Sequence, residues 1–184
     1  MWLTAILLFA GLAFFAFAQA ASARNQTQTA ADAAALAAAS EARDQIMQRL
    51  SLAIEGGEAW QEWVTDPTVP GPFGGAAQQL AAANNASVVA GPQLTEVSGY
   101  PGFRVQVRRN DSVGDTVIPG TEAMHAKADA VAVLQPRCEI DGGTDPAEPL
   151  ELNCDGEIVD IDPENFKPDD LPDASVLFSV NLAE

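Results

Sequence analysis

The feature that most constrains this chain is a long uncharged N-terminal stretch that leads into a run without helix breakers. Residues 1–23 have no charged side chain, and Trp2–Ala18 is almost wholly apolar. No glycine or proline occurs between Leu12 and Glu55, and Gly56-Gly57 follows. Because glycine and proline are the residues that interrupt helices, the sequence predicts one helix from about Trp2 to Glu55, roughly 80 Å long at 1.5 Å per residue.

The first part of this helix is expected to span a membrane. A run of 17 apolar residues lies at the short end of the range for a bilayer-spanning helix, and Trp2 suits the membrane interface. The competing interpretation is a cleaved signal peptide, since Ala16-Phe17-Ala18 and Ala18-Gln19-Ala20 both have small residues at the two cleavage positions. The missing basic residues before the run and the missing helix breaker favour a retained anchor.

The second part of the helix is rich in alanine and is expected to project from the membrane. Partly apolar residues recur there at steps of three and four, as on one face of a helix: Leu36, Ala39, Arg43, Met47, Leu50 and Ile54. Alanine permits close helix–helix approach, so this half is a candidate contact for partner proteins. The plainer alternative is that alanine is only a good helix former.

The pattern after Gly57 predicts an α+β domain. Short helices are expected at Glu58–Val64 and Ala76–Ala83, and the alternation of Phe103–Arg108 indicates a strand. Further strand candidates make an antiparallel sheet of four to six strands: Ser87–Ala90, Leu94–Val97, Ala126–Val133, Glu157–Ile161 and Val176–Leu182. The predicted division is a transmembrane segment (1–23), its alanine-rich helical continuation (24–55), and an exported acidic domain (56–184).

The charge balance excludes one class of partner. The net charge is −17 and the pI is about 4.1, whereas nucleic-acid binding needs clustered Lys and Arg to neutralise phosphates. Acidity is concentrated late, because Glu139 to Glu184 holds fourteen Asp or Glu residues and a single basic one, Lys167. This acidic segment is expected to be a solvated surface.

Two cysteines, Cys138 and Cys154, enclose a segment rich in glycine, proline and acids. In an exported domain this spacing predicts a disulfide that closes a loop, worth about 3 kcal/mol in the chain-entropy model; two free cytosolic thiols are the alternative. The expected flanking strands are Ala130–Leu134 and Leu150–Leu152. Arg24 alone would place the C-terminal part in the cytoplasm, but the cysteine pair favours an extracytoplasmic domain.

No residue pattern indicates catalysis, a cofactor or a small-molecule substrate. The single histidine, His125, has no evident nucleophile beside it and is expected to be an exposed sheet residue. The acids Asp160, Asp162 and Glu164, or Asp141 with Asp145, offer oxygen ligands but lack the spacing of a calcium loop, so no metal site is predicted. The chain is therefore expected not to be an enzyme.

Two tryptophans, Trp60 and Trp63, are the candidate partner contacts in the domain, because aromatic anchors dominate interface energetics. The alternative is that they pack a short helix onto the sheet, and this is the favoured interpretation of the two.

The run Gln28-Thr29-Ala30-Ala31-Asp32-Ala33-Ala34-Ala35-Leu36-Ala37-Ala38-Ala39, directly after a single apolar span, resembles a known family. It is similar to the TadE/TadG-type proteins of tight adherence (Tad) pilus assembly, especially actinobacterial ones, in which a membrane helix leads into Q-x-A-A-D-A-A-A-L-A-A-A. The similarity covers about Leu3–Ala42. It implies a minor-pilin-like or assembly component of a Flp-type pilus or related secretion system, in contact with the lipid bilayer and with other pilus components.

The expectation is therefore a single-pass membrane protein with its C-terminal domain outside the cytoplasm. The alternative function is an anchored or secreted acidic binding module that captures a ligand or calcium at the cell surface.

Overall fold

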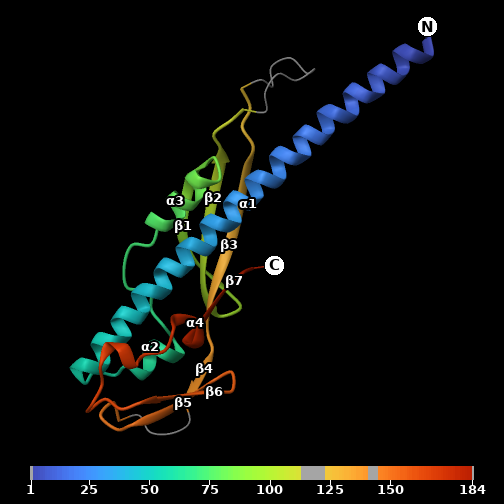
Figure 1. Ribbon diagram of the computed structural model, residues 1–184. Helices are drawn as coiled ribbons and strands as arrows, with labels where there is room; N and C mark the ends of the chain where they lie inside the picture. The colour runs from blue at the N-terminus through green and yellow to red at the C-terminus, as the bar shows by residue number, and fades with distance from the viewer. Residues whose placement is uncertain (1, 113–122, 141–144, 184) are drawn as a thin grey trace.

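A single helix dominates the computed structural model, which describes residues 2–112, 123–140 and 145–183. Helix α1 runs from Trp2 to Gly56 without interruption, and its N-terminal half extends beyond the rest of the molecule (Figure 1). It ends where Gly57 adopts a φ of +66°. The amides of Gly57 and Glu58 then donate to the carbonyls of Ile54 and Ala53, at 3.1 and 2.9 Å, which is the Schellman arrangement of a helix C-terminus. The predicted uninterrupted helix is confirmed.

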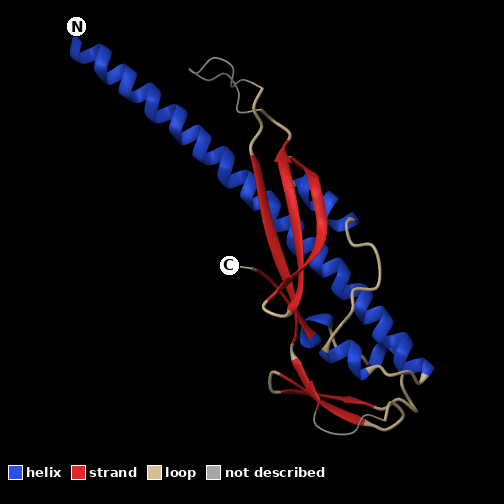
Figure 2. Cartoon of the chain, turned by 180° about the vertical axis from the view of Figure 1, so that it is seen from behind, coloured by secondary structure: helices blue, strands red, loops and turns tan. Residues whose placement is uncertain are grey.

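The larger of two antiparallel sheets lies along the second half of α1 (Figure 2). Its strand order is β1-β2-β3-β7, with the bounds β1 Ala86–Val97, β2 Tyr100–Arg109, β3 Lys127–Pro136 and β7 Phe178–Leu182. Strands β1 and β2 form a hairpin through Ser98-Gly99, both at positive φ, as a two-residue turn of the I′ type requires.

The smaller sheet lies at the end of the molecule remote from the N-terminus (Figure 1). Its order is β4-β5-β6, with the bounds Cys138–Ile140, Leu150–Cys154 and Glu157–Ile161. Asp155-Gly156, also at positive φ, turns β5 into β6. The α+β class and antiparallel pairing are confirmed, but the described strands form sheets of four and three rather than a single sheet.

The residues that the structure describes contain four further, short helical segments: α2 Gln61–Thr65, α3 Gly75–Ala83, the 3₁₀ turn η1 Pro168–Asp170 and α4 Ala174–Leu177. Helix α3 packs against α1, and the Glu41 carboxylate of α1 accepts from the Ala76 amide at its N-terminus, at 3.0 Å. Asp173 caps α4 by accepting from the Ser175 amide and hydroxyl, at 2.8 and 2.6 Å. Both bonds hold the pKa of the Asp173 carboxyl below its usual range, and the bond from the Ser175 hydroxyl has the larger effect.

The core lies between α1 and one face of the larger sheet. Phe103, Val105 and Val107 alternate along β2 as fully buried residues, and β2 and β3 both pack on α1. The Phe103 ring meets Phe73 edge to face with centroids 5.0 Å apart. On the helix side the buried residues are mostly alanines, which bring the α1 backbone close to the strands.

Candidate functional site: a membrane anchor joined to the domain

The N-terminal half of α1 presents large apolar side chains to its surroundings. Trp2, Phe9 and Phe17 are 87%, 76% and 75% exposed, and the most apolar window of the helix has no residue buried inside the chain. Exposing this many aromatic and aliphatic residues to water is unfavourable. By length and composition this helix can cross a membrane once, which supports membrane anchoring through a single span.

The helix changes character at Thr27, the first residue of α1 that is buried in the chain. The Thr27 hydroxyl donates to the Ala23 carbonyl at 2.7 Å, so its polar atom is satisfied within the helix. On either side of it, Gln26 accepts from the Arg109 guanidinium, and the Gln28 amide donates to the Asp129 carbonyl at 3.2 Å. These contacts attach the end of the sheet to the point where the exposed apolar segment ends.

The alanine stripe of α1 is buried inside the chain's own domain. Its members have no exposed surface: Ala30, Ala31, Ala34, Ala35, Ala38, Ala39 and Ala42. These alanines are therefore not available to a partner, whereas contact of the other faces of the alanine-rich half with pilus components stays a prediction. The physical reason is that alanine permits close approach of any backbone, a strand as well as a helix, and here β2, β3 and α3 all pack against α1.

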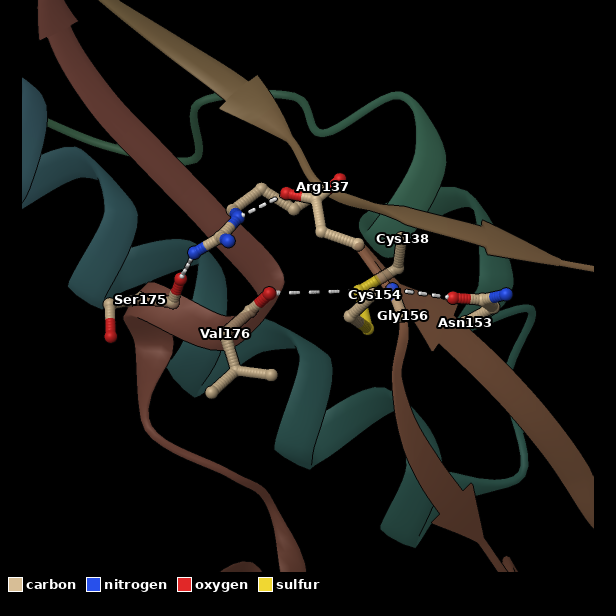
Figure 3. The surroundings of a disulfide bond; sticks show 8 residues. Arg137, Cys138, Asn153, Cys154, Gly156, Ser175 and Val176 are labelled. Carbon is tan, nitrogen blue, oxygen red and sulfur yellow. Dashed lines mark hydrogen bonds and ion pairs between the residues drawn. A yellow bond between two sulfur atoms is a disulfide. The ribbon is translucent and has the colours of Figure 1, made fainter.

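The disulfide between Cys138 and Cys154 is present. The two cysteines are direct partners in the β4–β5 pairing, and the bridge lies beside α4 (Figure 3). The expected flanking strand was wrong: β4 pairs with β5, whereas Ala130–Leu134 belongs to β3 of the larger sheet. That strand reaches Pro136, and the chain then crosses to the second sheet within two residues.

Arg137 lies at this crossing point and connects three segments (Figure 3). Its guanidinium donates to the Asp155 carboxylate and to the Ser175 carbonyl, both at 2.7 Å. Its backbone amide donates to the Leu177 carbonyl at 2.9 Å. Arg137 therefore fixes the smaller sheet against α4, a role that its isolated position in the sequence does not reveal.

The two tryptophans differ in accessibility. Trp60 is fully buried, and its indole N–H donates to the Pro146 carbonyl at 3.1 Å, so it offers no surface to a partner. Trp63 is half-buried and packs against the core. Partner contact through Trp63 stays a prediction.

The residues weighed for chemistry are not assembled into a reactive site. His125 is half-buried and its Nδ1 lies 3.0 Å from the Arg109 carbonyl. Asp162 accepts from the Glu164 amide at 3.2 Å and from the Asn165 side chain at 2.8 Å, within its own turn. Among the described residues no group of three or more His, Cys, Asp or Glu side chains is arranged to hold a metal ion; Asp141 lies outside them.

The comparison with protein families matches one segment of the chain. Residues 1–41 match the model of the Tad family, described as Flp pilus-assembly TadE/G-like. No curated protein and no solved structure gives a significant match. The matched residues comprise the exposed apolar half of α1 and the first alanines that pack on the sheet. The resemblance inferred from the alanine run is thus confirmed, and over residues 1–41 the chain is similar to the TadE/G-like proteins of Flp pilus assembly.

Proposed function

We propose that the chain is a minor-pilin-like or assembly component of a Flp-type pilus or related secretion system, anchored by α1 in the cell membrane. The observation that carries this proposal is the continuity of α1. One helix combines an exposed apolar half with a half that forms one side of the domain core, and the TadE/G-like match falls on that combination.

The domain is proposed to lie outside the cytoplasm. The disulfide supports this side, because disulfides persist in oxidising compartments. The Arg24 side chain beside the apolar segment favours the opposite orientation. We give a single basic residue less weight, as evidence for the side of the membrane, than the disulfide that joins two strands of the smaller sheet.

The role is proposed to be structural and not catalytic. The family description names pilus assembly and no reaction. The alternative of a calcium-capturing module gains no support from the carboxylates of the described residues, which are not grouped for a metal.

The test is a gene deletion with complementation in the organism that encodes the chain. Loss of pili, measured by electron microscopy and by pilin in the sheared fraction, is the expected result. A Leu8→Lys/Leu12→Lys variant should fail to restore pili, because two charges in the span oppose membrane insertion.

The matched control carries the same two charges on exposed residues of the domain. Leu94 and Ile158 are 56% and 53% exposed, so Leu94→Lys/Ile158→Lys should restore pili. Normal piliation of the deletion strain, or equal complementation by both variants, would overturn the proposal.

A further inference from the structure

The basic residues of this acidic chain are unevenly distributed along its long axis. Four of the nine Lys and Arg residues lie at the end of the domain nearest the exposed apolar segment: Arg24, Arg108, Arg109 and Lys127. The smaller sheet and the segment after it, which carry most of the late acidic residues, lie at the opposite end (Figure 1). Among the described residues, the molecule therefore has a basic end beside its anchor and an acidic end away from it.

The contacts of α1 define how near this basic end is to the span. Arg109 donates to Gln26, and its amide donates to the Ala126 carbonyl at 2.9 Å. Gln26 follows the uncharged segment, which ends at Ala23, by three residues, or about 4.5 Å of helix rise. The headgroup layer is about 5–7 Å thick on each side of the hydrocarbon. With residues 2–23 in the bilayer, the basic end lies at headgroup level.

Arg108 and Lys127 form an unfavourable pair within the chain. They are direct partners in the β2–β3 register, and both side chains are exposed. Like charges opposite each other across two strands destabilise a sheet. Neither side chain has an ion pair among the residues that the structure describes, so the arrangement is suited to an external anion.

The described acids nearby are already used. Asp111 pairs with Arg109 at 3.4 Å, and Asp129 pairs with Arg104 at 2.9 Å. Asp32 accepts from the Gln28 side chain at 2.8 Å. Asp115 and Glu122 lie outside the described residues.

We propose that Arg24, Arg108 and Lys127 form a docking surface for the anionic phospholipid headgroups of the leaflet from which α1 emerges. This inference rests on the proposed membrane anchoring. Two observations argue for these headgroups: their charge is opposite to that of the three side chains, and the basic end lies at their depth. Contact with them should hold the basic end of the domain against the membrane. Each basic residue near an anionic surface increases binding about five-fold.

The test uses the only two lysines of the chain, Lys127 in the basic end and Lys167 in the acidic end. The full-length protein is placed in nanodiscs of phosphatidylcholine alone, or of phosphatidylcholine and phosphatidylglycerol in equal parts. Both lysines are exposed in the structure, and a water-soluble amine-acylating reagent is applied briefly. Mass spectrometry then gives the ratio of Lys127 to Lys167 modification.

The ratio should fall about five-fold or more when phosphatidylglycerol is present, and should recover at about 1 M salt, where the Debye length is only about 3 Å. An Arg24→Gln/Arg108→Gln variant should lose most of this protection. The control Arg49→Gln also removes a charge from an exposed residue of α1. Arg49 lies roughly 37 Å along the helix from Arg24 at 1.5 Å per residue, so this variant should keep the protection of Lys127.

An equal ratio in the two nanodiscs, with the protein retained in both, would overturn the lipid surface and leave the anchoring proposal intact. An acidic protein would then be the alternative occupant to test. Failure of the protein to remain in either nanodisc would overturn the anchoring proposal, and this inference with it.

Discussion

The alanine stripe of α1 makes a sharp prediction about packing. Ala38 has no exposed surface and lies on the buried face of α1, the helix against which β2, β3 and α3 pack. Replacing it with leucine adds three carbon atoms where the helix and the sheet are already in contact. Because overpacking a filled core forces strained rotamers or backbone shifts that typically cost 1–3 kcal/mol, we expect Ala38→Leu to lower the free energy of unfolding by about 2–3 kcal/mol.

The assay is thermal unfolding of the full-length protein in detergent, followed by near-ultraviolet circular dichroism, for which the buried Trp60 is a reporter. For a chain of this length, each kcal/mol shifts the melting temperature by about 2–4 °C. The expected decrease for Ala38→Leu is therefore roughly 4–12 °C. The helix propensities of alanine and leucine are similar, so a decrease of this size reports packing.

The matched control is Ala33→Leu. Ala33 is half-buried and lies about 140° around the helix from Ala38, so its substitution should cost less than about 0.5 kcal/mol. Equal melting temperatures for the two variants would refute the packing argument. An unchanged melting temperature together with weaker binding of Ala38→Leu to pilus components would show instead that the alanine stripe contacts a partner protein.

Three further outcomes are expected from the same preparation. Replacing both cysteines of the Cys138–Cys154 bridge with serine opens a loop with a sequence separation of 16 and should cost about 3 kcal/mol; an unchanged denaturation midpoint would contradict this. Phe103→Ala, at a fully buried ring, should cost about 3–5 kcal/mol, whereas Leu94→Ala, at an exposed residue, should cost less than about 0.5 kcal/mol. Because the Asp173 pKa is lowered, its capping contribution should persist above the ordinary carboxyl pKa and disappear as the pH falls through the lowered value. Ser175→Ala should raise that pKa in an NMR titration, and an unchanged value would show that the hydroxyl bond is not its cause.

The parts of the fold that depend on local sequence could be predicted. The absence of glycine and proline between Leu12 and Glu55 allows α1 to continue to Gly56. The alternation in Phe103–Arg108 identifies the central part of β2. Both patterns act over a few residues, which is the range in which backbone preference and side-chain periodicity decide the outcome.

The parts that depend on tertiary pairing could not be predicted. Glycine and proline usually end a strand, so the sequence Gly91-Pro92 predicts two separate strands, Ser87–Ala90 and Leu94–Val97. In the structure these are one strand, β1, which passes Gly91-Pro92 with a shift in its pairing with β2. A Cβ atom at Gly91 would collide with the Arg104 carbonyl, a close approach that only the folded sheet shows. In the same way, the partner strand of Cys154 depends on the crossing at Arg137, which no local pattern marks.

The same distinction between local pattern and tertiary pairing explains which part of the candidate site could be predicted. The anchor and the TadE/G-like segment have a linear sequence signal. The attachment of the sheet to the anchor through Gln26 and Arg109 joins residues 83 positions apart, so the basic end beside the membrane becomes visible only in the fold.

The central claim is that α1 is kept as one helix and anchors the domain in the membrane. Alkaline carbonate extraction of cell membranes, followed by intact-mass measurement of the pelleted protein, tests it most directly. We predict that the protein stays in the membrane pellet and that its measured mass includes residues 1–23. A soluble mature chain that begins near Ala20 or Ala21 would contradict it.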